Sequence, residues 1–132
     1  MEKVFVYGTL MKGFGNHVLL KDARYLGTAQ LKGYGLYCVT PHYPGIVPQH
    51  GNSVKGEVYE VDNSMIKQLD TLEGEGSLYS RIEKSCTMDT GRAENVYVYI
   101  WLGTVHQKDF VPGDFTPWHP DVLNEINRRG DQ

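Results

Sequence analysis

A carboxylate on the apolar side of a predicted helix is the residue of this chain best suited to chemistry. The segment NSMIKQLDTLE, residues 63–73, predicts an amphipathic helix, since each helical residue turns by about 100°. Its apolar stripe, about 120° wide by that spacing, is formed by Met65, Ile66, Leu69 and Leu72. Glu73 falls inside the stripe, four residues after Leu69. Burial raises the pKa of a carboxyl group towards neutrality, which suits a general acid and base. The open alternative is a helix that frays at Glu73 and turns this side chain outward.

A second candidate is the bare backbone turn at Tyr7, Gly8, Thr9 and Leu10, which follows an apolar strand near the amino terminus. Glycine lets the backbone approach a ligand closely, and successive unpaired N–H groups form a concavity that holds an oxygen atom. The glycines that follow do not spell a phosphate-binding loop, so a carboxylate or amide oxygen is the expected ligand. The alternative is an ordinary glycine turn at the end of a strand.

The remaining reactive residues show no pattern of a known site. Five histidines are scattered without the spacing of metal ligands, so no metal site is expected. Cys38 and Cys86 lie far apart without a CxxC motif, which favours free buried thiols in a reducing compartment and a cytoplasmic protein. A cysteine–histidine nucleophilic pair has no local signature but stays open as an alternative.

Charge and hydropathy exclude several classes of partner. The net charge of −3 gives no basic surface for nucleic acid. No apolar run approaches the ~20 residues that span a bilayer, and the first residues lack the pattern of a signal peptide. We therefore expect a single domain, residues 1–132, that acts on a small molecule as a monomer or weak homodimer.

The candidate residues need a scaffold of many short strands. Alternating apolar residues predict strands at 3–7, 54–61, 79–88 and 94–103, with a hairpin turn at 89–92. Residues 23–40 predict two short strands broken at Lys32 and Gly33. The stretch 41–53 is rich in proline and glycine, so only a brief strand at 46–47 and a turn at 50–53 are expected there.

Helices are few and short in this prediction. One or two turns are expected at 16–23, capped by Asn16, and the helix at 63–73 is expected to be capped by Asp62 and stopped by Gly74. An irregular connection, 104–118, precedes a last helix from Pro120 to about residue 129. The predicted fold class is α+β, a small mixed β-barrel with two to three short helices.

Taken together, these motifs resemble the γ-glutamyl cyclotransferase superfamily. The resemblance rests on VFVYGTL, a following KG…NH loop, and GEVYEVD…LDTLEG…LYSR, in two blocks at about residues 3–20 and 55–81. It extends less distinctly to the strand VYVYIW. The details are most similar to γ-glutamylamine cyclotransferase and to its short bacterial and plant relatives.

The resemblance implies a barrel enzyme that converts a γ-glutamyl amide into 5-oxoproline and a free amine without metal or cofactor. It aligns Glu73 with the catalytic acid and base, and it assigns substrate binding to the backbone of Tyr7, Gly8, Thr9 and Leu10. Tyr79 is expected to support the pocket, and Arg81 to form a structural ion pair. Glu75 lies close enough to raise the pKa of Glu73, although a solvent-exposed position is the other reading.

Two points stay open in this comparison. The segment 41–53 is particular to this chain and is expected to shape the leaving-group side of the pocket, so the identity of the amine does not carry over. The rival to an enzyme is a non-catalytic module that keeps the same pocket to bind a small metabolite or a partner protein.

Overall fold

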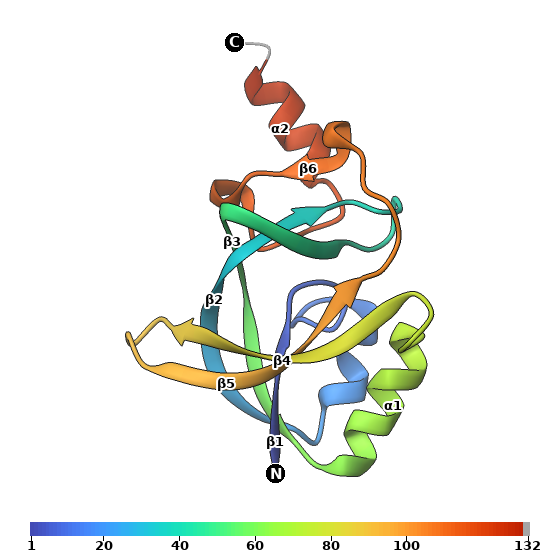
Figure 1. Ribbon diagram of the computed structural model, residues 1–132, viewed down its shortest axis with the longest axis vertical. Coiled ribbons are helices and arrows are strands. Elements are labelled where there is room, and N and C mark those ends of the chain that lie inside the picture. Colours follow the sequence, from blue (N-terminus) through green and yellow to red (C-terminus); the bar gives the residue numbers. More distant parts are fainter. Residues whose placement is uncertain (131–132) are drawn as a thin grey trace.

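Strands dominate the computed structural model, which describes residues 1–130 (Figure 1). In chain order they are β1 (Glu2–Val6), β2 (Arg24–Tyr37), β3 (Gly45–Val61), β4 (Tyr79–Met88), β5 (Ala93–Trp101) and β6 (Phe110–Val111). Strands β4 and β5 form the expected hairpin, with its turn at residues 89–92.

The sheet closes on itself. Its strand order is β3-β1-β5-β4-β2-β6, and β2 also pairs with β3, so that five strands form a ring and β6 adds to the edge of β2. Strands β1 and β5 run parallel, with Val4 opposite Tyr97, while the other neighbours are antiparallel. The predicted small mixed β-barrel is confirmed.

Two α-helices lie at opposite ends of this barrel (Figure 1). Helix α1 (Asn63–Glu73) contacts the short 3-10 helix η1 (Gly15–Leu20), and α2 (Val122–Gly130) follows β6 at the far end. The connection 104–118 holds two further 3-10 turns, η2 (Gln107–Asp109) and η3 (Gly113–Phe115). No helix within residues 1–130 is long and apolar enough to cross a bilayer.

The helices η1 and α2 begin at residues other than those predicted. Asn16 does not cap η1, because Phe14 occupies the cap position without a side-chain hydrogen bond and the Asn16 amide is used elsewhere. Helix α2 starts at Val122 instead of Pro120, since the backbone at 120–121 forms a turn in which the Val122 N–H bonds to the His119 carbonyl.

The brief strand predicted at 46–47 lies within β3, but the prediction for residues 48–53 was wrong. Strand β3 continues through them, and the expected turn at 50–53 is a bulge within the strand, with Gly51 at φ +86°. Tyr34 pairs with Pro48 and Lys32 with Ser53, so residues 49–52 lie opposite Gly33 alone. Pairing with β2 keeps this segment extended, which its own proline and glycine content does not predict.

The first strand is buried on both faces, which explains its continuous apolar run. Phe5 and Tyr7 belong to a core cluster together with Leu36, Val58 and Trp118, whereas Val4 and Val6 face a second cluster. That second cluster contains residues of η1, β3, α1 and β5: Leu20, Tyr59, Val61, Ile66, Leu69 and Tyr99. Helix α1 is thereby held against the strand whose end forms the turn.

Gly56 is needed where β3 passes β1. A Cβ atom at this position would lie 2.4 Å from the carbonyl oxygen of Val6 and 2.7 Å from the Phe5 ring. We expect Gly56→Ala to lower the free energy of unfolding by about 1–3 kcal/mol through overpacking, measured by urea denaturation. Gly15→Ala is the control, since no atom lies within 4 Å of its added Cβ. Equal stability of the two variants would contradict this account.

Candidate active site

Glu73 is held at the end of α1 by a well-formed helix terminus. The helix begins at Asp62, whose carboxylate accepts the Met65 N–H at 2.8 Å, and ends at Gly74 in the left-handed conformation. The N–H groups of Gly74 and Glu75 bond to the carbonyls of Thr71 and Asp70, which is a Schellman motif. The helix therefore does not fray at Glu73, and the outward alternative is excluded. Leu72, which was expected in the apolar stripe of this helix, is 39% exposed.

The turn after β1 presents free backbone N–H groups. Its own closing bond runs from the Met11 N–H to the Gly8 carbonyl at 3.0 Å. Within residues 1–130, the N–H groups of Gly8, Thr9 and Leu10 have no acceptor. Such a row of unpaired donors is able to bind a carboxylate or amide oxygen.

Two side chains from η1 brace this turn. The Asn16 amide donates to the Thr9 hydroxyl at 2.8 Å, and His17 Nδ1 donates to the Leu10 carbonyl at 2.9 Å. Since a carbonyl oxygen only accepts, His17 must carry its proton on Nδ1. These contacts give the NH pair of the KG…NH loop a role in the turn, where the sequence had predicted only a helix cap for Asn16.

Glu73 and the turn face the same cavity. Its volume is about 470 Å³. All of the predicted site residues line it: Tyr7, Gly8, Thr9, Leu10, Glu73 and Tyr79. The rest of the lining comes from β1, η1, the segment before β3, α1, the α1–β4 connection and β5: Phe5, Val6, Asn16, His42, Tyr43, Pro44, Leu72, Leu78 and Tyr99. The structure thus brings together two motifs that are more than sixty residues apart in the sequence.

The surroundings of Glu73 raise its pKa to about 7, and burial is the cause. Three phenols lie near it, but each hydroxyl is donated to another acceptor. Tyr7 bonds to the Tyr99 carbonyl at 2.6 Å, Tyr79 to the Pro44 carbonyl at 2.7 Å, and Tyr99 to Asp70 at 2.7 Å. Burial is the main cause that raises the pKa of Tyr7 and of Tyr79, and the nearby Glu73 carboxylate adds to it in both. Glu73 is therefore left without a compensating donor among the described residues.

Tyr79 and Arg81 are two residues apart on β4 and therefore lie on the same face of the strand. Tyr79 is buried and holds the Pro44 carbonyl at the cavity wall. Arg81 makes a two-pronged ion pair with Asp70, with Nε to Oδ1 at 2.8 Å, and its guanidinium lies over the Tyr97 ring. The Asp70 carboxylate also accepts the Tyr99 hydroxyl, so this pair ties α1 to β4 and β5.

Glu75 takes the solvent-exposed position of the two considered. Its carboxylate accepts the Arg81 N–H at 3.2 Å, and burial alone accounts for the raised pKa of Glu73. Glu75 is therefore a useful neighbour for comparison.

Gly8 is required by packing as well as by the open turn. A Cβ at this position would lie 2.9 Å from Pro44 Cδ, so any larger residue would displace the cavity wall that Tyr79 supports. The close approach of the turn to Pro44 in the cavity wall therefore requires glycine at position 8.

Glu57 on β3 holds the segment that follows the turn. Its Oε1 accepts the Lys12 N–H at 3.0 Å and the Tyr59 hydroxyl at 3.0 Å, and the Tyr59 ring packs against His17. We expect Glu57→Ala to lower the free energy of unfolding by about 1–3 kcal/mol, because two donors lose their acceptor. Glu57→Gln keeps an amide oxygen in place and should retain most of the stability. Thermal unfolding of both variants tests this, and equal losses in both would contradict it.

The other reactive residues do not assemble into a second centre. Within residues 1–130, no group of three or more His, Cys, Asp or Glu side chains is arranged to hold a metal ion. Cys38 and Cys86 are free thiols with raised pKa values, mainly through burial, and neither lines the cavity. A cysteine nucleophile in this cavity is therefore excluded.

The barrel and its cavity define a known class of fold. The structure is similar to that of an AIG2-like protein from Mus musculus, with a TM-score of 0.72 and 29% identity over 91% of this chain and 86% of that one. This class is a small mixed barrel with helices at its ends.

Sequence comparison makes the assignment narrower. The family model described as gamma-glutamyl cyclotransferase, AIG2-like, matches residues 4–118, and the chain belongs to this family. It is 42% identical over 79 residues to the gamma-glutamylcyclotransferase family protein YtfP of Escherichia coli, covering 60% of this chain and 68% of that one. It is 28% identical to the gamma-glutamylaminecyclotransferase of Rattus norvegicus, covering 95% and 91%.

Proposed function

We propose that this protein is a cyclotransferase that cleaves a γ-glutamylamine into 5-oxoproline and the free amine. The observation that carries the proposal is Glu73, a carboxyl group of pKa about 7 that shares one cavity with the free N–H groups of residues 8–10. A group of this pKa exchanges protons readily near neutral pH. The rat relative named for this activity supports the choice of γ-glutamylamines.

The turn holds the glutamyl part of the substrate. Its N–H groups bind the polar oxygens of the glutamyl head, and the cavity folds the chain so that the α-amino nitrogen lies against its own γ-carbonyl carbon. Because the nucleophile belongs to the substrate, positioning supplies a large part of the rate. No metal or cofactor takes part in this scheme.

Glu73 moves the protons. As the neutral α-amino nitrogen attacks and the new C–N bond forms, the Glu73 carboxylate takes a proton from that nitrogen. The protonated Glu73 then gives this proton to the leaving nitrogen while the original amide bond breaks. The products are the five-membered lactam and a neutral amine, and Glu73 returns to its carboxylate form.

The test is release of 5-oxoproline from γ-glutamyl alkylamines, γ-glutamyl-ε-lysine, γ-glutamyl-α-amino acids and glutathione, measured by chromatography. Release from a γ-glutamylamine supports the proposal. Binding of these compounds without release would favour instead a module that keeps the pocket without catalysis.

The setting of the reaction is part of the proposal. The free thiols of Cys38 and Cys86 support a reducing compartment, the cytoplasm. In this proposal the protein is a monomer or weak homodimer. It acts on small molecules and binds neither nucleic acid nor a membrane. Sedimentation of the purified protein tests the oligomeric state.

A further inference from the structure

Asp70 lies on α1 three residues before Glu73, and its carboxylate accepts three hydrogen bonds. Oδ1 accepts the Tyr99 hydroxyl at 2.7 Å and Arg81 Nε at 2.8 Å. Oδ2 accepts a second nitrogen of Arg81 at 3.3 Å. The proton transfers assigned to Glu73 do not use this carboxylate, so its part in the site is still to be explained.

The β4–β5 hairpin places the two donors of Asp70 side by side. Arg81 is paired directly with Tyr99 across the strands, so their side chains stand as neighbours on one face. The Arg81 guanidinium also lies over the ring of Tyr97, two residues from Tyr99 on that face. Arg81 is thereby fixed, and its two-pronged ion pair holds Asp70 where the carboxylate accepts the Tyr99 hydroxyl.

Tyr99 is close enough to Glu73 for their charges to interact. Both side chains line the cavity, and Tyr99 is only 3% exposed. Burial is the main cause that raises the pKa of Tyr99, and the hydrogen bond to Asp70 and the charge of the Glu73 carboxylate add to it. A phenol has one hydrogen to donate. The Tyr99 hydroxyl is therefore not available to Glu73 while it donates to Asp70.

We infer that Asp70 is a positioning residue that holds the Tyr99 hydroxyl away from the Glu73 carboxylate and so leaves this carboxylate without a donor. For its catalytic consequence, the inference rests on the proposed function. The other two phenols near Glu73 donate to backbone carbonyls, those of Tyr99 and Pro44. Asp70 is the one acceptor of the three that is a side chain, so a substitution tests the arrangement directly.

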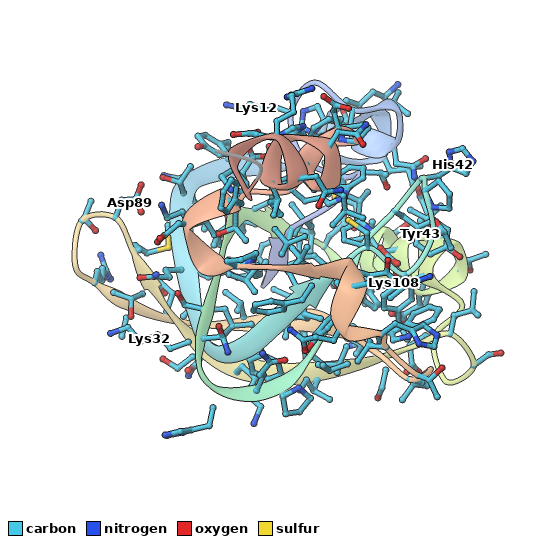
Figure 2. All side chains as sticks on the ribbon, turned by 90° about the horizontal axis from the view of Figure 1, so that it is seen from above. Lys12, Lys32, His42, Tyr43, Asp89 and Lys108 are labelled. Carbon is cyan, nitrogen blue, oxygen red and sulfur yellow. The ribbon has the colours of Figure 1, made fainter. Side chains whose placement is uncertain are left out.

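The groups around Glu73 come from several elements. The titratable residues in the cavity lining are Tyr7 on β1, Tyr79 on β4, Tyr99 on β5, and His42 and Tyr43 before β3. The charged neighbours are Asp70 on α1 itself, Glu75 on the following turn, Arg81 on β4, and Lys108 of η2, which lies near Tyr43 in the view of Figure 2. Burial is the cause of the raised pKa of Glu73, so a freed Tyr99 hydroxyl would supply a donor that the described residues do not supply in the wild type.

Asp70→Ala frees the Tyr99 hydroxyl. Because a hydrogen bond to an ionised group is about twice as strong as one between neutral groups, the freed hydroxyl should turn to the Glu73 carboxylate. We expect the pKa of Glu73 to fall from about 7 to about 6 or below, since a donor favours the ionised form. The carbon-13 chemical shift of the Glu73 carboxyl, followed by NMR against pH, measures this pKa, and Glu73→Gln identifies the signal.

Two controls separate the hydroxyl from the charge of Asp70. Asp70→Asn removes the charge but keeps an oxygen in the place of Oδ1, which accepts both short bonds, so the pKa of Glu73 should stay near 7. Asp70→Ala combined with Tyr99→Phe has no hydroxyl to turn, and the pKa should again stay near 7. Asp70→Ala with Arg81→Met leaves no unpaired guanidinium, and it replaces the single variant if that one folds poorly.

Activity gives a second readout of the same change. For a γ-glutamylamine, the ratio of kcat/KM, Asp70→Ala over wild type, should rise about tenfold from about pH 8 to about pH 5, because a base of lower pKa stays ionised at lower pH. The ratio cancels the titration of the substrate's own amine. Damage to the fold alone would lower kcat/KM without this rise towards acid pH.

Each outcome decides the inference. A fall in the pKa of Glu73 that requires both the loss of the Asp70 oxygen and the presence of the Tyr99 hydroxyl supports it. An unchanged pKa in Asp70→Ala overturns it and leaves the proposed function intact. An equal fall in Asp70→Asn, or a fall that persists with Tyr99→Phe, also overturns it, because charge would then be the cause. The NMR titration needs no turnover, so it decides this inference even if the absence of 5-oxoproline release overturns the proposed function.

Discussion

Glu73→Gln is expected to lower kcat for 5-oxoproline release by about 10²- to 10⁴-fold, the range that general acid–base catalysis contributes. The amide keeps the shape of the side chain but neither takes nor returns a proton. Substrate affinity should change little, because binding is assigned to the N–H groups of residues 8–10. Single-turnover kinetics with a γ-glutamylamine and equilibrium binding of the same compound measure the two quantities separately.

Glu75→Gln is the matched control for this loss. It makes the same chemical change two residues along the chain, on a side chain that is exposed and does not line the cavity. Its kcat should stay within about twofold of the wild type, since surface charges act weakly. A folded Glu73→Gln protein with unchanged turnover would end the proposed mechanism.

Glu73→Gln should also stabilise the protein at high pH. The pKa of Glu73 is raised from 4.5 to about 7 by burial, so the folded state binds this proton more tightly than the unfolded state. Below pH 4.5 the group is protonated in both states and costs nothing. As the pH rises to 7 the buried carboxylate costs progressively more, up to about 3 kcal/mol at about 1.4 kcal/mol per pKa unit.

Glu73→Gln removes this dependence because the amide does not titrate. We therefore expect the difference in free energy of unfolding, variant minus wild type, to grow by up to about 3 kcal/mol between pH 4 and pH 8. Urea denaturation followed by tryptophan fluorescence at both pH values measures it. A constant difference would mean that Glu73 has an ordinary pKa.

These two results are linked by one physical cause. Burial without a donor makes the Glu73 carboxylate expensive and also makes it a competent acid and base near neutral pH. The three phenols that could have relieved the cost donate instead to Tyr99, Pro44 and Asp70. We therefore expect the Glu73 carboxylate to lower the stability of the folded protein and to be required for its activity.

Local signals predicted the parts of the fold that depend on neighbours in the chain. The α1 helix begins and ends at the predicted residues because its cap, Asp62, and its stop, Gly74, act within one helical turn. The β4–β5 hairpin turn likewise depends on a few residues around Gly91, which has φ +91°. The azimuth of Glu73 placed it on the apolar side of this helix but left a frayed, outward position open, and its catalytic role was implied by the family resemblance.

Errors occurred where distant segments override local preference. Residues 48–53 are held extended by β2, and Leu72 lines the cavity and is 39% exposed instead of packing in the core. Asn16 serves the turn at Thr9 in place of its own helix. Tyr99 was missed as a lining residue because no pattern of spacing connects it with Glu73, whereas Tyr43 and Pro44 belong to the segment 41–53 that was expected to shape the pocket.

The sequence by itself determined the two chemical elements of the site, a carboxylate on the apolar side of α1 and a bare turn after β1, since both follow from periodicity and residue type over about ten positions. Only the tertiary structure decided that they share a cavity and that the nearby phenols leave Glu73 uncompensated. Closure of the barrel, through the parallel pairing of β1 with β5, sets these relations. They depend on contacts between residues far apart in the chain, which local propensity does not encode.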